Sequence, residues 1–289
     1  MSILVDQNTR LLVQGITTNK GQLCAERMVA GGTHVVAGVD DGHGGEWVAG
    51  VPIFDTAREA VAATGANVAI IAVLASQVEE AILEAVDVGL EAAVCITSLV
   101  PVWDMVRVRS YLRDKSIHLI GPDSAGVFTP GRCLAGVLAP EFLKPGTVGV
   151  VSRSGSLTYE SVCLLTRAGF GQSTVVCVGS GLILGMSFID VLAMFEDDPT
   201  TEQVLIVGEI GGQEEERAAE FVADRMSKPV VAFVAGQTSP PGRKMGHAGA
   251  MIEGYGDMAQ LKMEAFERAG TRVARSLVEV TQLLDRNSV

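Results

Sequence analysis

The sequence predicts an α/β fold with mainly parallel sheets, and three observations lead to this prediction. Hydrophobic residues make up 48% of the 289 residues but aromatic residues only 5%, so small and branched aliphatic side chains must fill the core. The chain holds 33 glycines, which suit tight turns between strands and helices. Short apolar runs alternate with segments of helical periodicity, as in right-handed βαβ crossovers. A chain this apolar is not disordered.

The first half, residues 1–126, carries five apolar runs that we expect to be strands. They are Arg10–Val13, Val35–Val39, Val68–Leu74, Ala93–Thr97 and His118–Ile120. Between the third and fourth runs, Gln77–Val88 repeats its apolar residues at helical spacing. This half is therefore expected to form a Rossmann-like sheet.

Residues 127–146 interrupt this rhythm with prolines and glycines, and we expect them to be the connecting segment between two domains. The pattern restarts in residues 147–289, which are expected to form a second open α/β sheet. The expected strands are Val148–Val151, Ser173–Val178, Gln203–Val207 and Val230–Val234. The expected helices are Leu157–Arg167 and Gln213–Met226.

The net charge bears on which ligands the chain can bind, and the cysteines bear on the compartment in which it works. With 22 basic and 34 acidic residues the net charge is −12, which argues against nucleic acid as a partner. The five cysteines form no CxxC pair, so we expect reduced thiols and a cytoplasmic protein. We expect no secretory signal and no metal site. We also expect no membrane span, because no run of about 18 apolar residues occurs.

In open α/β sheets, ligands bind on the loops at the carboxyl ends of strands. The first such loop, 15–21, has glycines at both ends and includes Thr17, Thr18, Asn19 and Lys20. It suits a phosphate cradle at a helix start, and an ordinary βα turn fits equally well. The second loop, 40–45, includes His43 and would hold a ribose or a phosphate, or else be a solvated turn.

A third loop follows the strand Val148–Val151 and reads Ser-Arg-Ser-Gly-Ser from residue 152. Ser154, Gly155 and Ser156 would place hydroxyl and backbone N–H groups around one point, which makes an anion-binding site. The alternative is simple capping of the next helix, which needs only one hydroxyl. A nucleophilic Ser154 is disfavoured because the GxSxG pattern is absent.

The fourth loop, 239–250, follows the strand Val230–Val234 and carries His247 between two glycines. Arg243 and Lys244 precede it, and an open ring near positive charge suits a histidine that accepts and releases a phosphoryl group. Glu209 ends another strand, before paired glycines, and would accept the Nδ1–H of a histidine. On these residues alone, both side chains also fit ordinary loop positions.

Three segments together resemble the family of succinyl-CoA synthetase α subunits, which includes the small subunit of malate–CoA ligase. They are Val148–Glu160, Gly208–Gly212 and Met245–Ala250, and the similarity extends over nearly the whole chain. The resemblance implies an N-terminal CoA-binding Rossmann-like domain and a C-terminal flavodoxin-like ligase domain. It also implies a β subunit with an ATP-grasp fold, in an αβ or (αβ)₂ assembly.

The resemblance further implies a reaction. An NTP with Mg²⁺, bound mainly by the β subunit, would phosphorylate His247. The phosphoryl group would pass to a dicarboxylate, and the thiol of coenzyme A would then attack the acyl phosphate. Glu209 matches the glutamate that orients the histidine, and Tyr159 matches a tyrosine near the acid. The phosphate cradle matches Ser154, Gly155 and Ser156. The CoA site matches Thr17, Thr18, Asn19, Lys20, His43, Ile96, Thr97 and Ser98.

The departures from the family pattern lie mostly in the CoA site. Thr18 replaces a usual glycine, His43 a lysine, and Ser98 an acidic residue. The segments Leu74–Ser76, Gly121–Gly126 and Gly179–Gly185 also differ, and the last lacks the family's aspartate. Because a neutral histidine beside two aspartates attracts phosphates less than a lysine does, we expect weaker binding of CoA.

These departures leave two alternatives to an acid–CoA ligase subunit. One is a non-catalytic or regulatory paralogue that binds an acyl-CoA or a partner ATP-grasp chain. The other keeps phosphoryl transfer but releases an acyl phosphate, or uses another acceptor, without CoA.

Overall fold

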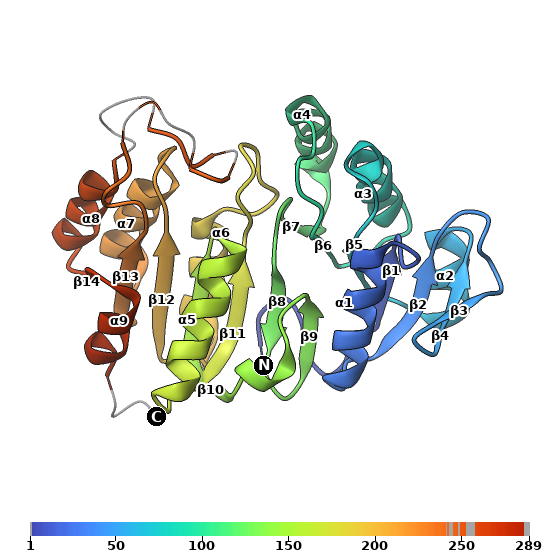
Figure 1. The fold of residues 1–289 in the computed structure, drawn as a ribbon, viewed down its shortest axis with the longest axis horizontal. Coiled ribbons are helices and arrows are strands. Elements are labelled where there is room, and N and C mark those ends of the chain that lie inside the picture. The colour runs from blue at the N-terminus through green and yellow to red at the C-terminus, as the bar shows by residue number, and fades with distance from the viewer. Residues whose placement is uncertain (1, 241, 243–244, 248, 253–257, 286–289) are drawn as a thin grey trace.

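The computed structural model describes residues 2–240, 242, 245–247, 249–252 and 258–285. In these residues two seven-stranded sheets lie side by side (Figure 1). Both sheets are mainly parallel and carry helices on both faces, so the predicted α/β architecture is confirmed.

The first sheet has the strand order β3-β4-β2-β1-β5-β6-β7, and only β3 pairs in antiparallel fashion. Its strands are β1 (Leu11–Gln14), β2 (Val35–Val39), β3 (Trp47–Val48), β4 (Val51–Phe54), β5 (Val68–Ile71), β6 (Ala92–Cys95) and β7 (His118–Ile120). Its helices are α1 (Asn19–Ala30), α2 (Ala57–Thr64), α3 (Val78–Asp87) and α4 (Val102–Tyr111), with 3₁₀ turns at Ala75–Gln77 and Leu112–Asp114. All five predicted strands are present, with ends shifted by up to three residues.

The second sheet has the order β14-β13-β12-β10-β11-β8-β9, with β8 and β9 antiparallel at one edge. Its strands are β8 (Gly126–Thr129), β9 (Cys133–Gly136), β10 (Pro145–Ser152), β11 (Gln172–Cys177), β12 (Gln203–Gly208), β13 (Val230–Val234) and β14 (Arg272–Ala274). Its helices are α5 (Gly155–Arg167), α6 (Phe188–Asp197), α7 (Glu214–Arg225), α8 (Ala259–Arg268) and α9 (Leu277–Leu283), with a 3₁₀ turn at Pro140–Phe142.

The segment 127–146 differs from the expectation of a connecting segment, because it supplies strands β8 and β9 to the second sheet. Glycines in this region allow the backbones of the two hairpin strands to approach each other closely. A Cβ atom on Gly126 would lie 2.4 Å from the carbonyl oxygen of Ala135, and one on Gly136 would lie 2.3 Å from that of Ala125. The prolines and glycines of this segment therefore mark turns within a sheet and do not mark an open linker.

One apolar core runs between the two halves. It joins Leu11 and Val13 of the first sheet to Val127 and Ala135 of the hairpin and to Val176 of the second sheet, all with side chains essentially excluded from solvent. Helix α1 packs against β9 at this junction (Figure 1). A shared core of this kind holds the loops of the two sheets in one arrangement.

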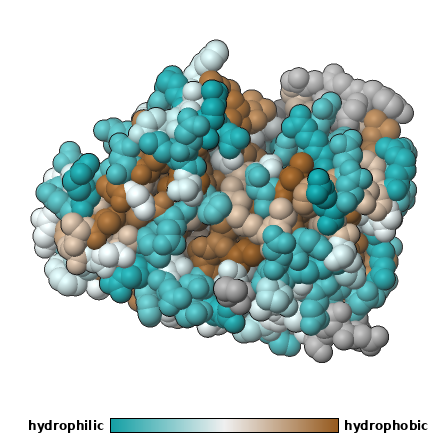
Figure 2. All heavy atoms as spheres, turned by 180° about the vertical axis from the view of Figure 1, so that it is seen from behind, coloured by the Kyte–Doolittle hydropathy of each residue, from teal (hydrophilic) through white to brown (hydrophobic). Residues whose placement is uncertain are grey.

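The surface is largely hydrophilic when seen from behind, with apolar patches near the middle and at the upper edge (Figure 2). None of the helices in the described part of the chain combines the length and apolarity needed to cross a bilayer.

Candidate active site

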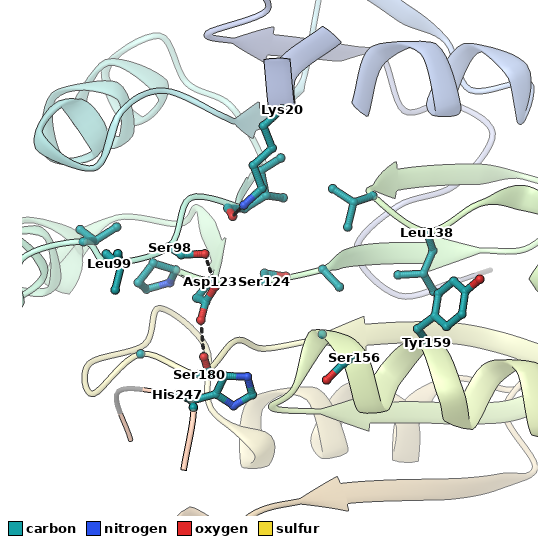
Figure 3. A pocket seen from close by; sticks show the side chains of 18 of the residues that line it. Lys20, Ser98, Leu99, Asp123, Ser124, Leu138, Ser156, Tyr159, Ser180 and His247 are labelled. Atoms are coloured by element: carbon teal, nitrogen blue, oxygen red, sulfur yellow. Dashed lines mark hydrogen bonds between the residues drawn. The ribbon is translucent and has the colours of Figure 1, made fainter. Parts of the chain in front are cut away.

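A cleft of about 920 Å³ lies where loops of the two sheets meet (Figure 3). The first half contributes Lys20, Ile96 and Ser98, and the second contributes Gly155, Ser156, Tyr159 and His247. The remaining lining residues are Arg27, Leu99, Val100, Val102, Pro122–Ala125, Val137, Leu138, Glu160, Ser180–Leu182 and Gly246. The cleft thus brings together the loops that follow several strands, as expected for open α/β sheets.

Helix α5 begins at one wall of the cleft with its N-terminus available to a ligand. Ser154 is the N-cap, and its Oγ accepts from the backbone N–H of Leu157 at 3.4 Å. Ser154 is buried and also contacts the hydroxyl of Ser156 at 3.2 Å. Among the described residues, no partner takes the N–H groups of Gly155 and Ser156, which both line the cleft. Helix starts of this kind attract anions through free N–H groups and the helix dipole.

His247 lies near this helix start and is held by a carboxylate. Its Nδ1 lies 2.8 Å from Oε2 of Glu209, which follows the end of β12. Because a carboxylate only accepts, Nδ1 carries the proton and Nε2 is left as the nucleophilic nitrogen. The side chain of His247 is 31% exposed and lines the cleft, whereas that of Glu209 is 6% exposed. Figure 3 shows the ring directed toward the cleft near Ser156.

Two glycines let the loops of Glu209 and His247 approach each other. Gly211 has φ +87°, and a Cβ atom there would lie 1.9 Å from the carbonyl oxygen of Gly249. Gly246, just before His247, has φ +90°, which L-residues rarely adopt. Glycine at these positions therefore permits the contact between residues 38 positions apart.

The surroundings raise the pKa of His247 above its ordinary value. The hydrogen bond to Glu209 has the largest effect, and burial of the ring offsets part of it. The charges of Glu209 and Asp123 raise the pKa further, and the charge of Arg153 lowers it. The ring is thus tuned to hold a positive charge, which suits attachment of a phosphoryl group to Nε2.

A buried network of charged side chains supports Glu209 from behind. Its backbone N–H donates to Oε1 of Glu215 at 3.1 Å. Arg153 donates from Nη1 to the carbonyl oxygen of Gly211 at 3.1 Å and to Glu215 at 3.4 Å. Lys262 donates to the other oxygen of Glu215 at 2.6 Å, and both side chains are fully buried. Burial raises the pKa of Glu215, but the charges of Arg153 and Lys262 outweigh it and leave that pKa below its ordinary value.

Loss of Lys262 is expected to destabilise the fold strongly. In Lys262→Met the carboxylate of Glu215 stays buried with Arg153 as its remaining charged partner, which should cost about 3–5 kcal/mol of unfolding free energy. Urea unfolding measures this difference. Arg107→Met, which removes surface ion pairs with Glu79 and Asp104, should leave the unfolding free energy nearly unchanged. Equal unfolding free energies of the two variants would contradict the stabilising role of Lys262.

Asp123 forms a clamp between the two halves at the floor of the cleft. Ser98 of the first half and Ser180 of the second each donate a hydrogen bond to one oxygen of its carboxylate (Figure 3). Its backbone N–H donates to the carbonyl oxygen of Thr97 at 3.0 Å. These hydrogen bonds hold the carboxylate in place at the cleft, and its charge raises the pKa of His247.

We expect Asp123→Asn to lower the pKa of His247. The amide keeps the shape of the side chain but removes a negative charge that raises this pKa. An NMR titration of the His247 ring in the full chain measures the change. Ser98→Ala, which leaves the charge of Asp123 in place, is the control and should move the pKa less. The prediction fails if Asp123→Asn leaves the pKa where it is in the wild type.

The first-half loops are largely bound to their own surroundings. Thr18 caps α1 by accepting from the N–H of Gly21 at 3.0 Å, and Thr17 donates to Asp40. Asn19 begins the helix with an exposed side chain. Lys20 donates from Nζ to the carbonyl oxygen of Ile96 and lines the cleft. Of the four residues predicted in the loop 15–21, Lys20 lines the cleft and the other three do not.

The loop that carries His43 also binds an internal anion. The N–H groups of Gly42 and Gly44 both donate to Oδ1 of Asp55 at 2.9 Å. His43 is exposed, and its hydrogen bond to Glu46 raises its pKa. Backbone groups that would suit a phosphate are therefore occupied by a carboxylate of the chain itself.

Several predicted residues lie outside the cleft lining. They are Thr17, Thr18, Asn19, His43, Thr97, Ser154 and Glu209. Thr97 donates to the carbonyl oxygen of Val73 at 2.8 Å, and Glu209 contacts the ring of His247 from outside the cleft lining. Arg243 and Lys244 lie outside the described residues.

Sequence reasoning did not assign roles to Asp123, Ser180, Arg153, Glu215 or Lys262. A signal was present for Asp123, which directly follows the Gly-Pro turn after β7 at a carboxyl strand end. No local signal marks Lys262, because its two carboxylate partners and the carbonyl oxygen of Gly212 lie 46 to 50 residues away in the sequence.

Comparisons with known proteins show which family the chain belongs to. The family model described as CoA binding domain matches residues 6–99, and the model described as CoA-ligase matches residues 151–272. A succinate–CoA ligase [ADP-forming] subunit alpha from Archaeoglobus fulgidus is 50% identical over 99% of this chain and 98% of its own length. The chain belongs to the family of succinate–CoA ligase α subunits.

Another member of the family and a solved structure are also similar to this chain. The family's α subunit from Aquifex aeolicus is 47% identical over 97% of this chain and 92% of its own length. The structure of ATP citrate lyase from Methanothrix soehngenii, in complex with citrate and coenzyme A, has a TM-score of 0.86 and 26% identity. That match covers 97% of this chain, which spans 50% of the lyase chain.

Proposed function

We propose that this chain is the α subunit of an NTP-dependent acid–CoA ligase that works through a phosphohistidine at position 247. One observation carries the proposal: His247 is held at Nδ1 by Glu209 and lines the same cleft as the free N-terminus of α5. A transient phosphoryl carrier needs a nucleophilic ring nitrogen, a fixed tautomer and an anion-binding site beside it.

The first step is phosphorylation of Nε2. This nitrogen forms a bond to the γ-phosphorus of an NTP, and the bond to the leaving NDP oxygen breaks with its electron pair. The ring becomes positively charged, and Glu209 stabilises that charge through the Nδ1 proton. The N–H groups of Gly155 and Ser156 and the dipole of α5 stabilise the phosphoryl oxygens.

In the following steps the cleft serves as the meeting place of the substrates. A carboxylate oxygen of a dicarboxylate attacks phosphorus, and the bond to Nε2 breaks with its electron pair returning to the ring. The sulfur of coenzyme A then bonds to the acyl carbon, the C–O bond to phosphate breaks with its electron pair on the phosphate oxygen, and the thiol proton leaves with the phosphate. Tyr159, whose ring packs on Phe142 at 4.7 Å between centroids, stands on the same wall as Ser156 and is proposed to contact the acid.

The partner is proposed to be a β subunit with an ATP-grasp fold that holds the NTP and Mg²⁺, in an αβ or (αβ)₂ assembly. Among the described residues there is no group of three or more side chains suited to hold a metal ion. Apolar side chains at the cleft support a protein partner, since Leu99 and Leu182 are 87% and 63% exposed. All five cysteines are free and buried, which supports a reducing, cytoplasmic setting.

Residues 1–126 are proposed as the CoA-binding domain and residues 147–289 as the ligase domain. Coenzyme A is proposed to bind at the first-half loops, with Lys20, Ile96 and Ser98 reaching the cleft. The occupation of Gly42 and Gly44 by Asp55, and of Thr17 by Asp40, favours weak binding of the CoA phosphates.

These occupied loops also favour a second candidate, a paralogue that binds acyl-CoA or the partner chain without turnover. Calorimetry with CoA and acyl-CoAs separates the two: tight binding without thioester formation supports the paralogue. A third outcome is NTP-dependent acyl hydroxamate formation without any CoA requirement, which would support release of an acyl phosphate.

The main test combines the chain with its β subunit and γ-labelled NTP. The expected result is acid-labile phosphate on the chain, which is discharged by a dicarboxylate together with CoA. A panel of short dicarboxylates then identifies the acid. Absence of label on the wild-type chain in the presence of its partner would refute the proposed function.

A further inference from the structure

An unpaired donor and an unpaired acceptor lie side by side behind His247. Five buried side-chain polar atoms have no hydrogen-bond partner in the part of the chain that the structure describes. Two of them are Nε of Arg153 and Oε1 of Glu209, which are 3.9 Å apart. Buried polar atoms are rarely left unpaired, so a neighbouring pair at the carboxylate that holds His247 calls for an explanation.

Arg153 touches each of the three segments that build the site. It directly precedes Ser154, the N-cap of α5. Its Nη1 donates to the carbonyl oxygen of Gly211 at 3.1 Å, in the loop that follows Glu209. Its Nη2 lies against Gly249, where a Cβ atom would be 3.0 Å away, in the loop that carries His247. Because Arg153 is only 4% exposed, its charge acts with little screening by water.

We propose that Arg153 is a positioning residue for the reaction at His247, and that its Nε–H closes onto Oε1 of Glu209 when a phosphoryl group is attached to Nε2. The proposal rests on the proposed function. A gap of 3.9 Å needs a movement of about 1 Å to become a hydrogen bond of ordinary length.

The change in charge supplies the driving force for this closure. A phosphoryl group adds net negative charge beside the start of α5 and draws the guanidinium toward it. Once Arg153 binds Oε1, Glu209 shares its charge between Arg153 and the Nδ1 proton, and holds that proton less strongly. The positive charge of the phosphorylated ring is then less stabilised, so its bond to phosphorus is easier to break when the acid arrives.

The first experiment uses the wild-type full chain and does not need the partner subunit. Phosphoramidate, a reagent that phosphorylates histidine directly, is added to ¹⁵N-arginine-labelled protein, with His247→Asn as the control for other histidines. The expected result is that the Nε–H signal of Arg153 moves downfield and exchanges more slowly with water as His247 is phosphorylated. An unchanged signal in the phosphorylated chain would overturn the proposal.

The second experiment measures the pKa of His247 by NMR in unphosphorylated variants. Among the described residues, the charged groups that act on the pKa of this ring are Glu209, Asp123 and Arg153. Arg153→Met is expected to raise the pKa, because the charge that lowers it is gone, and Arg153→Lys is expected to restore a value near the wild type. Arg109→Met is the matched control, since Arg109 lines the neighbouring cavity of about 560 Å³ with Arg153 and donates to Gly185.

Transfer from phosphorylated His247 to the acid tests the role in the reaction. With its charge kept but its Nε–H lost, Arg153→Lys should slow transfer by about tenfold to 100-fold, the cost of misplacement by about 1 Å. The proposal would be refuted if Arg153→Lys and the wild type transferred the phosphoryl group at equal rates. It would also be refuted if His247 had the same pKa in Arg153→Met and Arg109→Met. If Arg153→Met does not fold, the Nε–H signal of Arg153 in the wild-type chain still tests the proposal. Failure of NTP-dependent labelling would count against the proposed function. The phosphoramidate experiment would still test the closure of Arg153 onto Glu209, because it uses neither NTP nor the partner subunit.

Discussion

Replacing His247 with asparagine is expected to abolish both labelling by NTP and thioester formation. Asparagine fills a similar space and can still contact Glu209 but has no nucleophilic ring nitrogen. Removal of a nucleophile or a base that works as part of a unit costs at least about 1,000-fold in rate. The measurement is acid-labile phosphate on the chain after incubation with the β subunit and labelled NTP.

The matched control for this variant is His43→Asn. The side chain of His43 is exposed and has its hydrogen bond to Glu46, in a loop that does not line the cleft. It should therefore label as the wild type does. Equal labelling of His247→Asn and the wild type would show that phosphorus is carried elsewhere, and the ligase mechanism would have to be abandoned.

The second large effect is expected for Glu209→Gln. The amide keeps the size of the side chain, but it removes the negative charge that stabilises the ring when phosphorus is attached. We expect labelling of His247 to slow by about 100-fold or more, as when a charge-stabilising partner is lost from other active sites. Rapid mixing of the α and β chains with labelled NTP measures this rate.

The same variant has a defined effect on how stability depends on pH. The folded-state pKa of His247 lies above its ordinary value of 6.5, chiefly through the hydrogen bond to Glu209. The pair therefore contributes stability that is fully present below 6.5 and is lost as the pH rises through the folded pKa. In Glu209→Gln this loss should be smaller. Urea unfolding of both proteins across that range tests the sign, and parallel curves would contradict it.

The strands were predictable because their signal is local. Buried parallel strands such as β5 and β12 are short runs of apolar side chains bounded by turn residues, and both were expected within a few positions of where they lie. The hairpin of β8 and β9 was not expected as part of a sheet. Its role depends on pairing with β11, about 50 residues away, and its Pro and Gly residues look like those of a linker.

The site was predictable in part for the same reason. Ser154 caps α5 and Gly155 begins it, because a hydroxyl before a helical run is a local signal. His247 was singled out by its flanking glycines and by its resemblance to a family motif. Thr18, expected at the CoA site, caps α1 in the structure, and its place at that site stays a prediction.

The order of residues along the chain by itself determined two layered sheets, the helix start at Ser154 and a histidine set in a glycine-rich loop, because each depends on neighbours within a few positions. Only the folded molecule decided that Glu209 holds His247, that Asp123 is clamped between Ser98 and Ser180, and that Arg153 lies within reach of Glu209. These contacts join residues 25 to 57 positions apart. Their distances are set by how two sheets pack through one core, and no short stretch of sequence carries that information.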